Sequence, residues 1–329
     1  MSRFSRAALL GFVLGAATLL MGFSPETLKL TLALQGTGTA KWEIAAMQAL
    51  GLDKKYKLEL TVNDVADSTA GQVALQAKAA DVVLSDFVWV NLQRHQGNMV
   101  TMVPHSLAVG GLMVDPKAGI KSIADLKGKT LAVSGSPVDK SFVILSADYK
   151  KQTGGNLMDD ADVKFGAPPL VNELLTDGKA QAALNLWNWA AKAKVAGMTQ
   201  LSSVPDLLKD LGVTETPPLL GWTFFNDVAK TKNTEIVAFL KASFETKQAL
   251  LTDDSLWDKI RPVMNVKDDD ALFKQLRDDY RAGIVSHYIA SGMAPAKQAF
   301  ALMAQYGGKD VVGDVTDLDD GTFWEGFHK

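Results

Sequence analysis

The sequence predicts an α/β protein of two lobes, each a mostly parallel sheet flanked by helices, with a helical C-terminal region. Strand-like and helix-like patterns alternate up to about residue 225, which is typical of parallel sheets covered by helices. Residues 74–84 (ALQAKAADVVL) and 174–184 (LLTDGKAQAAL) resemble each other, which indicates two similar halves. The 329 residues suffice for two lobes, each with its own core.

The first half supplies three strands and two helices. Residues 28–34 (LKLTLAL) and 57–62 (KLELTV) alternate apolar and polar side chains with the period of a strand. Residues 81–84 (DVVL) are short and apolar, which favours a buried strand. Helices are predicted at 40–50, where Gly51 marks the end, and at 68–78.

The second half repeats this alternation and then becomes helical. Strands are predicted at 128–135, 162–165, 180–186 and 219–225, and helices at 138–151 and 170–177. Beyond Asn233 the apolar residues recur at helical spacing in segments 234–251, 255–263, 271–282 and 294–306.

Composition excludes several classes of protein. The net charge of −3, without a local basic block, argues against nucleic-acid binding. The absence of cysteine excludes disulfides, thiolate metal sites, a cysteine nucleophile and a cysteine-linked lipid. No P-loop, HExxH or nucleophile-elbow motif occurs. Residues 314–320 are acidic but do not match a calcium loop. We therefore expect no metal, no cofactor and no enzymatic activity.

The N-terminus predicts export. Arg3 and Arg6 precede an uncharged, mostly apolar run from Ala7 to Met21, the pattern of a secretory signal. The run is shorter than the ~20 residues that span a bilayer comfortably, although an uncleaved anchor stays an alternative. We expect residues 1–24 to be removed and the remainder to work in the periplasm.

Three segments resemble a known family. Residues 123–136 (IADLKGKTLAVSGS) are similar to the start of the second lobe in periplasmic solute-binding proteins. Residues 35–60 and 68–86 resemble the first ligand loop and a later helix–strand unit of the same proteins. Together they resemble the nitrate, sulfonate, taurine and thiamine-precursor branch of binding proteins for ABC importers.

This resemblance implies a two-lobed periplasmic-binding-protein-like fold of type II that closes on its ligand like a hinge. Lobe one is expected to comprise residues 25–107 and 222–329, and lobe two residues 108–221. The crossovers are expected near 106–112 and 218–222, and the C-terminal helices are expected to pack on lobe one. The implied partners are a small-molecule ligand and an ABC permease in the inner membrane, and the protein is expected to be a monomer.

The predicted ligand site lies where strands end and helices begin, the usual place for ligands of open parallel sheets. Five loops, at 35–42, 67–71, 85–89, 134–140 and 185–189, carry the candidates. Those with hydroxyl, amide or carboxylate groups, or a glycine that exposes the backbone, are Thr37, Gly38, Thr39, Ser68, Thr69, Asp86, Ser134, Ser136, Asp139 and Asn188. Helix capping is the alternative role for Thr37, Thr39, Ser68, Thr69 and Asp86, and a plain turn for Ser134 and Ser136.

Tryptophans are the second group of candidates. Trp42, Trp89, Trp187 and Trp222 fall in or near such loops, where indole faces could form apolar walls or hold a cation. Burial in the core is the alternative for one or two of them. Trp187 and Trp189 would share a face only on an extended chain.

The charged groups in these loops limit the choice of ligand. None of the five loops contains arginine, which weakens the case for a simple oxyanion ligand. A pyrimidine-binding or pyrimidine-synthesising protein of the same fold is the alternative function. The synthesis would need a histidine and a lysine in the cleft, and the predicted loops contain no histidine.

Overall fold

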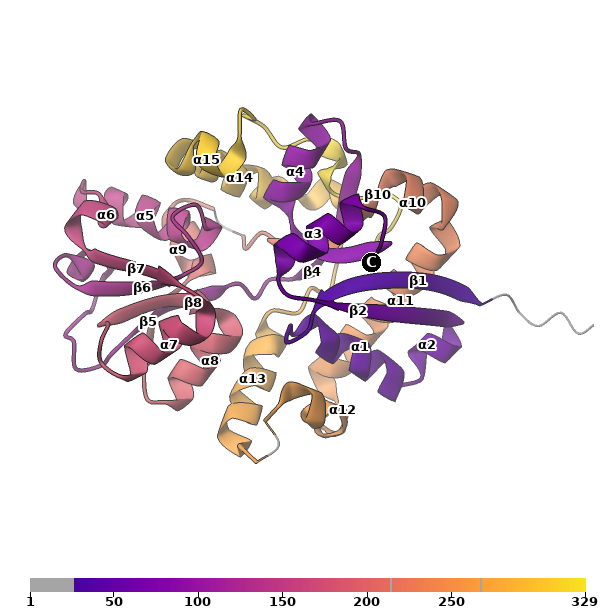
Figure 1. Ribbon diagram of the computed structural model, residues 1–329, viewed down its shortest axis with the longest axis horizontal. Coiled ribbons are helices and arrows are strands. Elements are labelled where there is room, and N and C mark those ends of the chain that lie inside the picture. The colour runs from indigo at the N-terminus through magenta and orange to yellow at the C-terminus, as the bar shows by residue number, and fades with distance from the viewer. Residues whose placement is uncertain (1–26, 214, 267) are drawn as a thin grey trace, which may run out of the picture.

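The computed structural model describes residues 27–329 except 214 and 267 (Figure 1). The predicted signal segment therefore lies outside the described residues. Two five-stranded sheets lie side by side, each flanked by helices. The predicted α/β fold class is confirmed. No helix in the described part combines the length and apolar character that a membrane crossing needs.

The first sheet, which defines lobe one, has the strand order β2-β1-β3-β10-β4. Its strands are β1 (Leu28–Gln35), β2 (Leu58–Val65), β3 (Val82–Asp86), β4 (Val100–Ser106) and β10 (Leu220–Phe225). Strand β10 is antiparallel to both neighbours, and the other four share one direction. The helices are α1 (Ala40–Ala49), α2 (Leu52–Lys55), α3 (Ser68–Gln76), α4 (Phe87–His95), α10 (Asn226–Thr231), α11 (Asn233–Thr252) and α12 (Asp254–Ile260).

The second sheet, which defines lobe two, repeats this plan with the order β7-β6-β8-β5-β9. Its strands are β5 (Gly110–Val114), β6 (Thr130–Ser134), β7 (Asp162–Gly166), β8 (Ala182–Leu186) and β9 (Thr199–Ser203). Strand β5 is the antiparallel one. The helices are α5 (Lys140–Thr153), α6 (Leu157–Asp160), α7 (Pro168–Thr176), α8 (Trp187–Val195) and α9 (Val204–Asp210). Short 3-10 turns occupy Ile123–Leu126, Arg261–Met264, Ala290–Gly292 and Asp320–Thr322.

The chain connects the carboxyl-end edges of the two sheets. Strand β4 ends at Ser106 beside the last residue of β3, because both pair with Leu220 of β10. Strand β5 then begins at Gly110, which pairs with Leu186, the last residue of β8. Only three residues separate the two strands, so the end of β4 and the start of β5 lie at most about 14 Å apart. The strand-end loops of both lobes therefore face each other.

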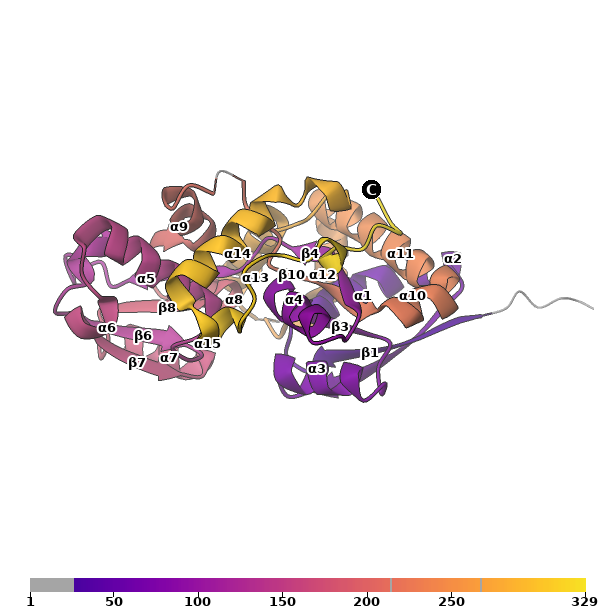
Figure 2. The same ribbon diagram turned by 90° about the horizontal axis from the view of Figure 1, so that it is seen from above.

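The C-terminal helices pack differently from the expectation. Helices α11 and α12 pack against α1 in lobe one, whereas α13 (Asp270–Ala282) packs on α8 and α14 (Ala294–Gly307) packs on α5, both in lobe two. Helix α15 (Lys309–Val312) follows α14 (Figure 2). The expectation that these helices pack on lobe one is thus wrong for α14, which packs on α5. Helix α13 contacts both lobes, because Phe273, Leu276 and Tyr280 share an apolar cluster with Trp42 and Trp257 of lobe one.

The chain also passes a third time between the lobes. Gly283 O accepts the N–H of Leu107, and Ile284 forms a bridge with Ser106. A Cβ at Gly283 would lie 2.5 Å from the Cβ of Ala108, so only glycine allows the two segments to approach this closely. For the domain boundaries we propose one change: because β10 begins at Leu220, lobe two should end before that residue.

Candidate functional site

Two contacts join the facing edges directly. The Lys140 ammonium at the start of α5 lies 3.3 Å from Oδ2 of Asp86 at the end of β3. The Trp187 indole at the start of α8 packs edge-on against that of Trp42 in α1, with 5.8 Å between ring centroids. Each contact joins a residue of one lobe to a residue of the other. The described arrangement is therefore one in which the lobes touch.

The first loop of lobe one, between β1 and α1, carries Thr37, Gly38 and Thr39. Thr37 is exposed, and the other two are half-buried. The N–H of Gly38 binds the Gln35 carbonyl. Thr39 stands at the N-cap of α1, but its hydroxyl makes no capping bond to the described residues. The hydrogen bond that the capping role of Thr39 would require is therefore not formed.

The second loop presents Ser68 and Thr69 on the exposed first turn of α3. Asp67 is the cap of this helix, since its Oδ1 accepts the N–H of Ala70 at 2.8 Å. Ser68 Oγ instead accepts a bond from the Gln35 amide at 3.3 Å. Neither hydroxyl is needed to start the helix.

The third loop contains Asp86 and Trp89. Oδ1 of Asp86 accepts the Trp89 N–H at 2.9 Å, which caps α4, while Oδ2 faces Lys140. The capping role given as an alternative for Asp86 is thus present. Trp89 is half-buried on the first turn of α4.

Lobe two contributes the loop from β6 to α5. Ser134 ends β6, and Ser136 is exposed. Between them Gly135 has a φ of +101°, which requires glycine or strain. Asp139 caps α5 by accepting the N–H of Ser141 at 2.9 Å. Burial raises the pKa of Asp139, against the opposing effect of hydrogen bonds from the first turn of α5.

Trp187 and Asn188 begin α8 as half-buried residues. Because the segment is helical, Trp187 and Trp189 point in different directions. Trp187 also packs against Tyr280 of α13, at 6.0 Å, whereas the Trp189 ring lies under Lys192, 3.7 Å from its ammonium.

Trp222 requires a correction. It is fully buried in β10, and its Nε1 donates to Ser243 at 3.2 Å. Its ring packs against Phe239 of α11 and His105 of β4. Trp222 belongs to the core of lobe one and is removed from the proposed site. Trp42 is also largely buried, at 6% exposure, but its contact with Trp187 keeps it at the junction of the lobes.

Sequence reasoning missed a buried polar cluster behind α1. The Glu43 carboxylate is fully buried and lies 2.8 Å from the ammonium of Lys247, which is 1% exposed. Ser243 donates to the same carboxylate, and the Tyr280 hydroxyl lies 3.4 Å from it. Tyr280 thereby links this cluster to Trp42 and Trp187. The one available signal was a charged residue, Glu43, among the apolar positions of the helix.

Two titratable groups at this cluster, Lys247 and His105, have shifted pKa values. Burial lowers the pKa of Lys247, while the neighbouring Glu43 raises it. Burial, with a contribution from Lys247, holds the pKa of His105 well below its usual range. His105 Nδ1 lies 3.4 Å from Glu43 but forms no hydrogen bond with the described residues. The His105 ring packs against Trp222.

We predict that the variant Lys140→Gln weakens the contact between the lobes. Both partners are partly exposed, so the ion pair contributes about 1 kcal/mol or less. Small-angle scattering of the ligand-free protein should show a larger radius of gyration for this variant at low salt, and a smaller difference at high salt. Lys179→Gln, which removes an exposed pair with Asp177 inside lobe two, is the matched control. Equal radii for both variants would contradict the prediction.

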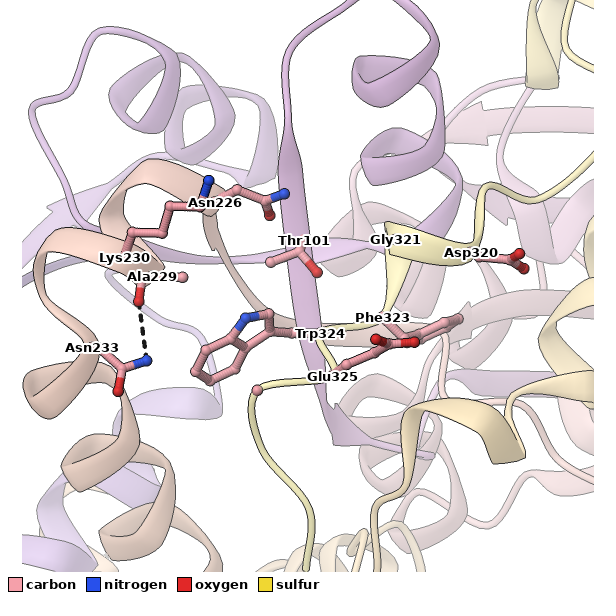
Figure 3. A pocket seen from close by; sticks show the side chains of 11 residues that line it. Thr101, Asn226, Ala229, Lys230, Asn233, Asp320, Gly321, Phe323, Trp324 and Glu325 are labelled. Atoms are coloured by element: carbon pink, nitrogen blue, oxygen red, sulfur yellow. Dashed lines mark hydrogen bonds between the residues drawn. The ribbon is translucent and has the colours of Figure 1, made fainter.

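Two surface cavities lie elsewhere. One, of about 690 Å³, is lined by Trp324 with Thr101, Asn226 and Lys230, among others (Figure 3). It lies where β4 begins and β10 ends, the end of the sheet opposite to Ser106 and Leu220. The other, of about 670 Å³, is lined by Phe300, Lys297 and residues 316–320. Neither contains a predicted site residue.

Comparisons with known proteins identify a family and a shared fold. A family model described as NMT1/THI5 like matches residues 44–253. No curated protein is significantly similar to the chain in sequence. The alkanesulfonate-binding protein SsuA from Xanthomonas axonopodis pv. citri bound to MOPS is 17% identical, with 91% of this chain and 99% of that chain covered and a TM-score of 0.67.

Two further structures share the fold. The periplasmic aliphatic sulphonate binding protein SsuA from Escherichia coli is 16% identical, with 88% and 91% covered and a TM-score of 0.69. The desulfurization enzyme DSZB is 12% identical, with 85% and 92% covered and a TM-score of 0.57. The fold of periplasmic binding proteins is thus established for this chain, and it also occurs in an enzyme.

Proposed function

The chain belongs to the NMT1/THI5-like family, and on that premise we propose that it is the solute-binding component of an ABC importer. The observation that carries the proposal is the topology at the lobe junction. The carboxyl-end edges of two separate sheets face each other there and make contact through Asp86–Lys140 and Trp42–Trp187. A solute held between those edges would contact both lobes at once.

Hinge closure follows from this arrangement. A ligand that binds groups on both lobes has a higher affinity for the closed form, and so shifts the population toward it. The hinge would comprise the three segments that pass between the lobes, near Leu107, before Leu220 and after Gly283. A permease that recognises both lobes would then distinguish the closed form from the open one.

The ligand site we propose combines hydroxyl and backbone donors with aromatic walls. Lobe one would contribute Trp42, Trp89, Asp86 and the hydroxyl-bearing loop residues, and lobe two would contribute the β6–α5 loop with Trp187 and Asn188. The residues are Thr37, Gly38, Thr39, Ser68, Thr69, Ser134, Ser136 and Asp139 in addition to those just named. We also propose that the protein is exported through residues 1–24 and acts in the periplasm as a monomer.

A thermal-shift screen of the purified protein tests this function. Nitrate, taurine, small sulfonates, amines and pyrimidines form the panel, and at least one solute should raise the midpoint of unfolding by mass action. The same solute should reduce the radius of gyration. If no solute in the panel did either, the proposal would lose its support.

The variant Thr39→Ala tests whether the first loop of lobe one belongs to the ligand site. We expect the affinity for the best solute of the screen to fall about fivefold to tenfold, the effect of one lost hydrogen bond. The unfolding midpoint without solute should stay the same, because the hydroxyl makes no capping bond within the described residues. Thr252→Ala, at the exposed end of α11, should change neither quantity. Unchanged affinity in Thr39→Ala would exclude this loop from the site.

An enzyme of the same fold is the second candidate, because DSZB shares the architecture. Its support here is weaker. The histidine nearest the crossover, His105, is 3% exposed and packs against Trp222 inside lobe one. It therefore does not reach the facing loops in the described arrangement.

A further inference from the structure

Three exposed apolar side chains lie at the edge of lobe two that faces lobe one. Leu170, Val138 and Leu186 are 48%, 42% and 42% exposed. They lie at the carboxyl ends of β7, β6 and β8, which are neighbouring parallel strands. The three side chains therefore line one continuous edge. Exposed apolar side chains gathered in one place mark an interaction site.

The same edge has few hydrogen-bond donors for an anion. Helix α7 begins with Pro168 and Pro169, which have no N–H to offer. Asp139 accepts the first free N–H groups of α5. The N–H of Trp187 binds the Val109 carbonyl. Several of the helix-start N–H groups that would normally attract an anion are thus missing or already bound.

The charges of the facing loops also disfavour an anion. Asp67 and Asp86 cap α3 and α4 in lobe one. Both lysines of these loops already have carboxylate partners, since Lys41 lies 2.8 Å from Asp64 and Lys140 lies 3.3 Å from Asp86. Together with Asp139, the carboxylates outnumber the ammonium groups, and the loops contain no arginine. An anionic head group would meet a net negative charge.

We propose that the ligand is an amine with an apolar body, the body lying against Val138, Leu170 and Leu186 and the amine facing the carboxylates of the loops. This inference rests on the proposed function and names the class of solute. Lobe one would bind the polar head through Asp86 and the Thr37–Thr39 loop. Lobe two would bury the apolar part and so stabilise the closed form.

Three ligands with the same benzyl group test which head-group charge the protein prefers. Phenylmethanesulfonate, benzyl alcohol and benzylamine share an aryl body and differ in the head group. Calorimetric titration of the purified full chain at pH 7 should give the highest affinity for benzylamine, at least tenfold above that for the sulfonate. The highest affinity for the sulfonate would overturn the inference.

Two valines of similar exposure test the apolar contact. Val138→Ser should lower the affinity for benzylamine severalfold. Val195→Ser should not, because Val195 is 40% exposed at the far end of α8, away from the junction. Equal affinities in the two variants would also overturn the inference.

The two proposals fail in different ways. Tight sulfonate binding with a reduced radius of gyration would leave solute capture intact and remove only the amine preference. If none of the three compounds, nor nitrate or taurine, produced binding or closure, solute capture itself would be contradicted, and the amine preference would fall with it.

Discussion

Replacing Glu43 by alanine is expected to lower the free energy of unfolding by about 3–5 kcal/mol, the usual cost of breaking a buried ion pair from one side. Glu43 is fully buried and lies 2.8 Å from the Lys247 ammonium. Without the carboxylate, Lys247 must either remain charged without its partner or lose its proton, and both are unfavourable. Urea denaturation followed by circular dichroism measures the change.

Two controls distinguish the effect of losing the ion pair on stability from the effect of losing side-chain volume. The double variant Glu43→Leu/Lys247→Met replaces both charges by apolar groups of similar size and should recover most of the lost stability. Glu59→Ala removes an exposed carboxylate 3.5 Å from Lys29 and should change stability by less than about 0.5 kcal/mol. A loss below about 1 kcal/mol for Glu43→Ala would show that the cluster is not held by this pair.

Replacing Trp187 by alanine is expected to reduce affinity for the best solute of the thermal-shift panel by about tenfold to a hundredfold. The indole packs on Trp42 and Tyr280 across the junction of the lobes. Each such aromatic pair contributes about 0.5–1.5 kcal/mol beyond its buried area. Because the contact with Trp42 joins lobe one to lobe two, its loss weakens the closed form and the binding that depends on it.

Trp189→Ala is the matched control for this prediction. Trp189 is also half-buried in α8, but its ring contacts Lys192 within lobe two. Its removal should leave affinity within about twofold of the parent. Calorimetric titration measures affinity, and small-angle scattering should show a more open ligand-free form for Trp187→Ala alone. Equal losses in both variants would mean that the aromatic junction does not control closure.

The elements of this protein could be read from the chain because their signals are local. The alternation in residues 28–34 and the apolar run at 81–84 predicted β1 and β3 within a few residues. The carboxyl ends of parallel strands meet at one edge of a sheet, so the loops at 37–39 and 67–71 could be placed together in lobe one. That the loop at 134–140 of lobe two faces them was implied by the family resemblance. The capping role of Asp86 was likewise foreseeable from its type and position.

The sequence alone thus determined the α/β class and the two-lobe plan, and it predicted the edge at which we propose the site. Only the tertiary structure decided which side chains face that edge. Trp222 is covered by Phe239 and Ser243 of α11, and Glu43 is buried against Ser243, 200 positions away. Helix α13 contacts α8 of lobe two and also packs on Trp42 and Trp257 of lobe one. A helix or strand pattern shows that a face is apolar, but the partner that covers it is chosen by long-range packing, which no local pattern records.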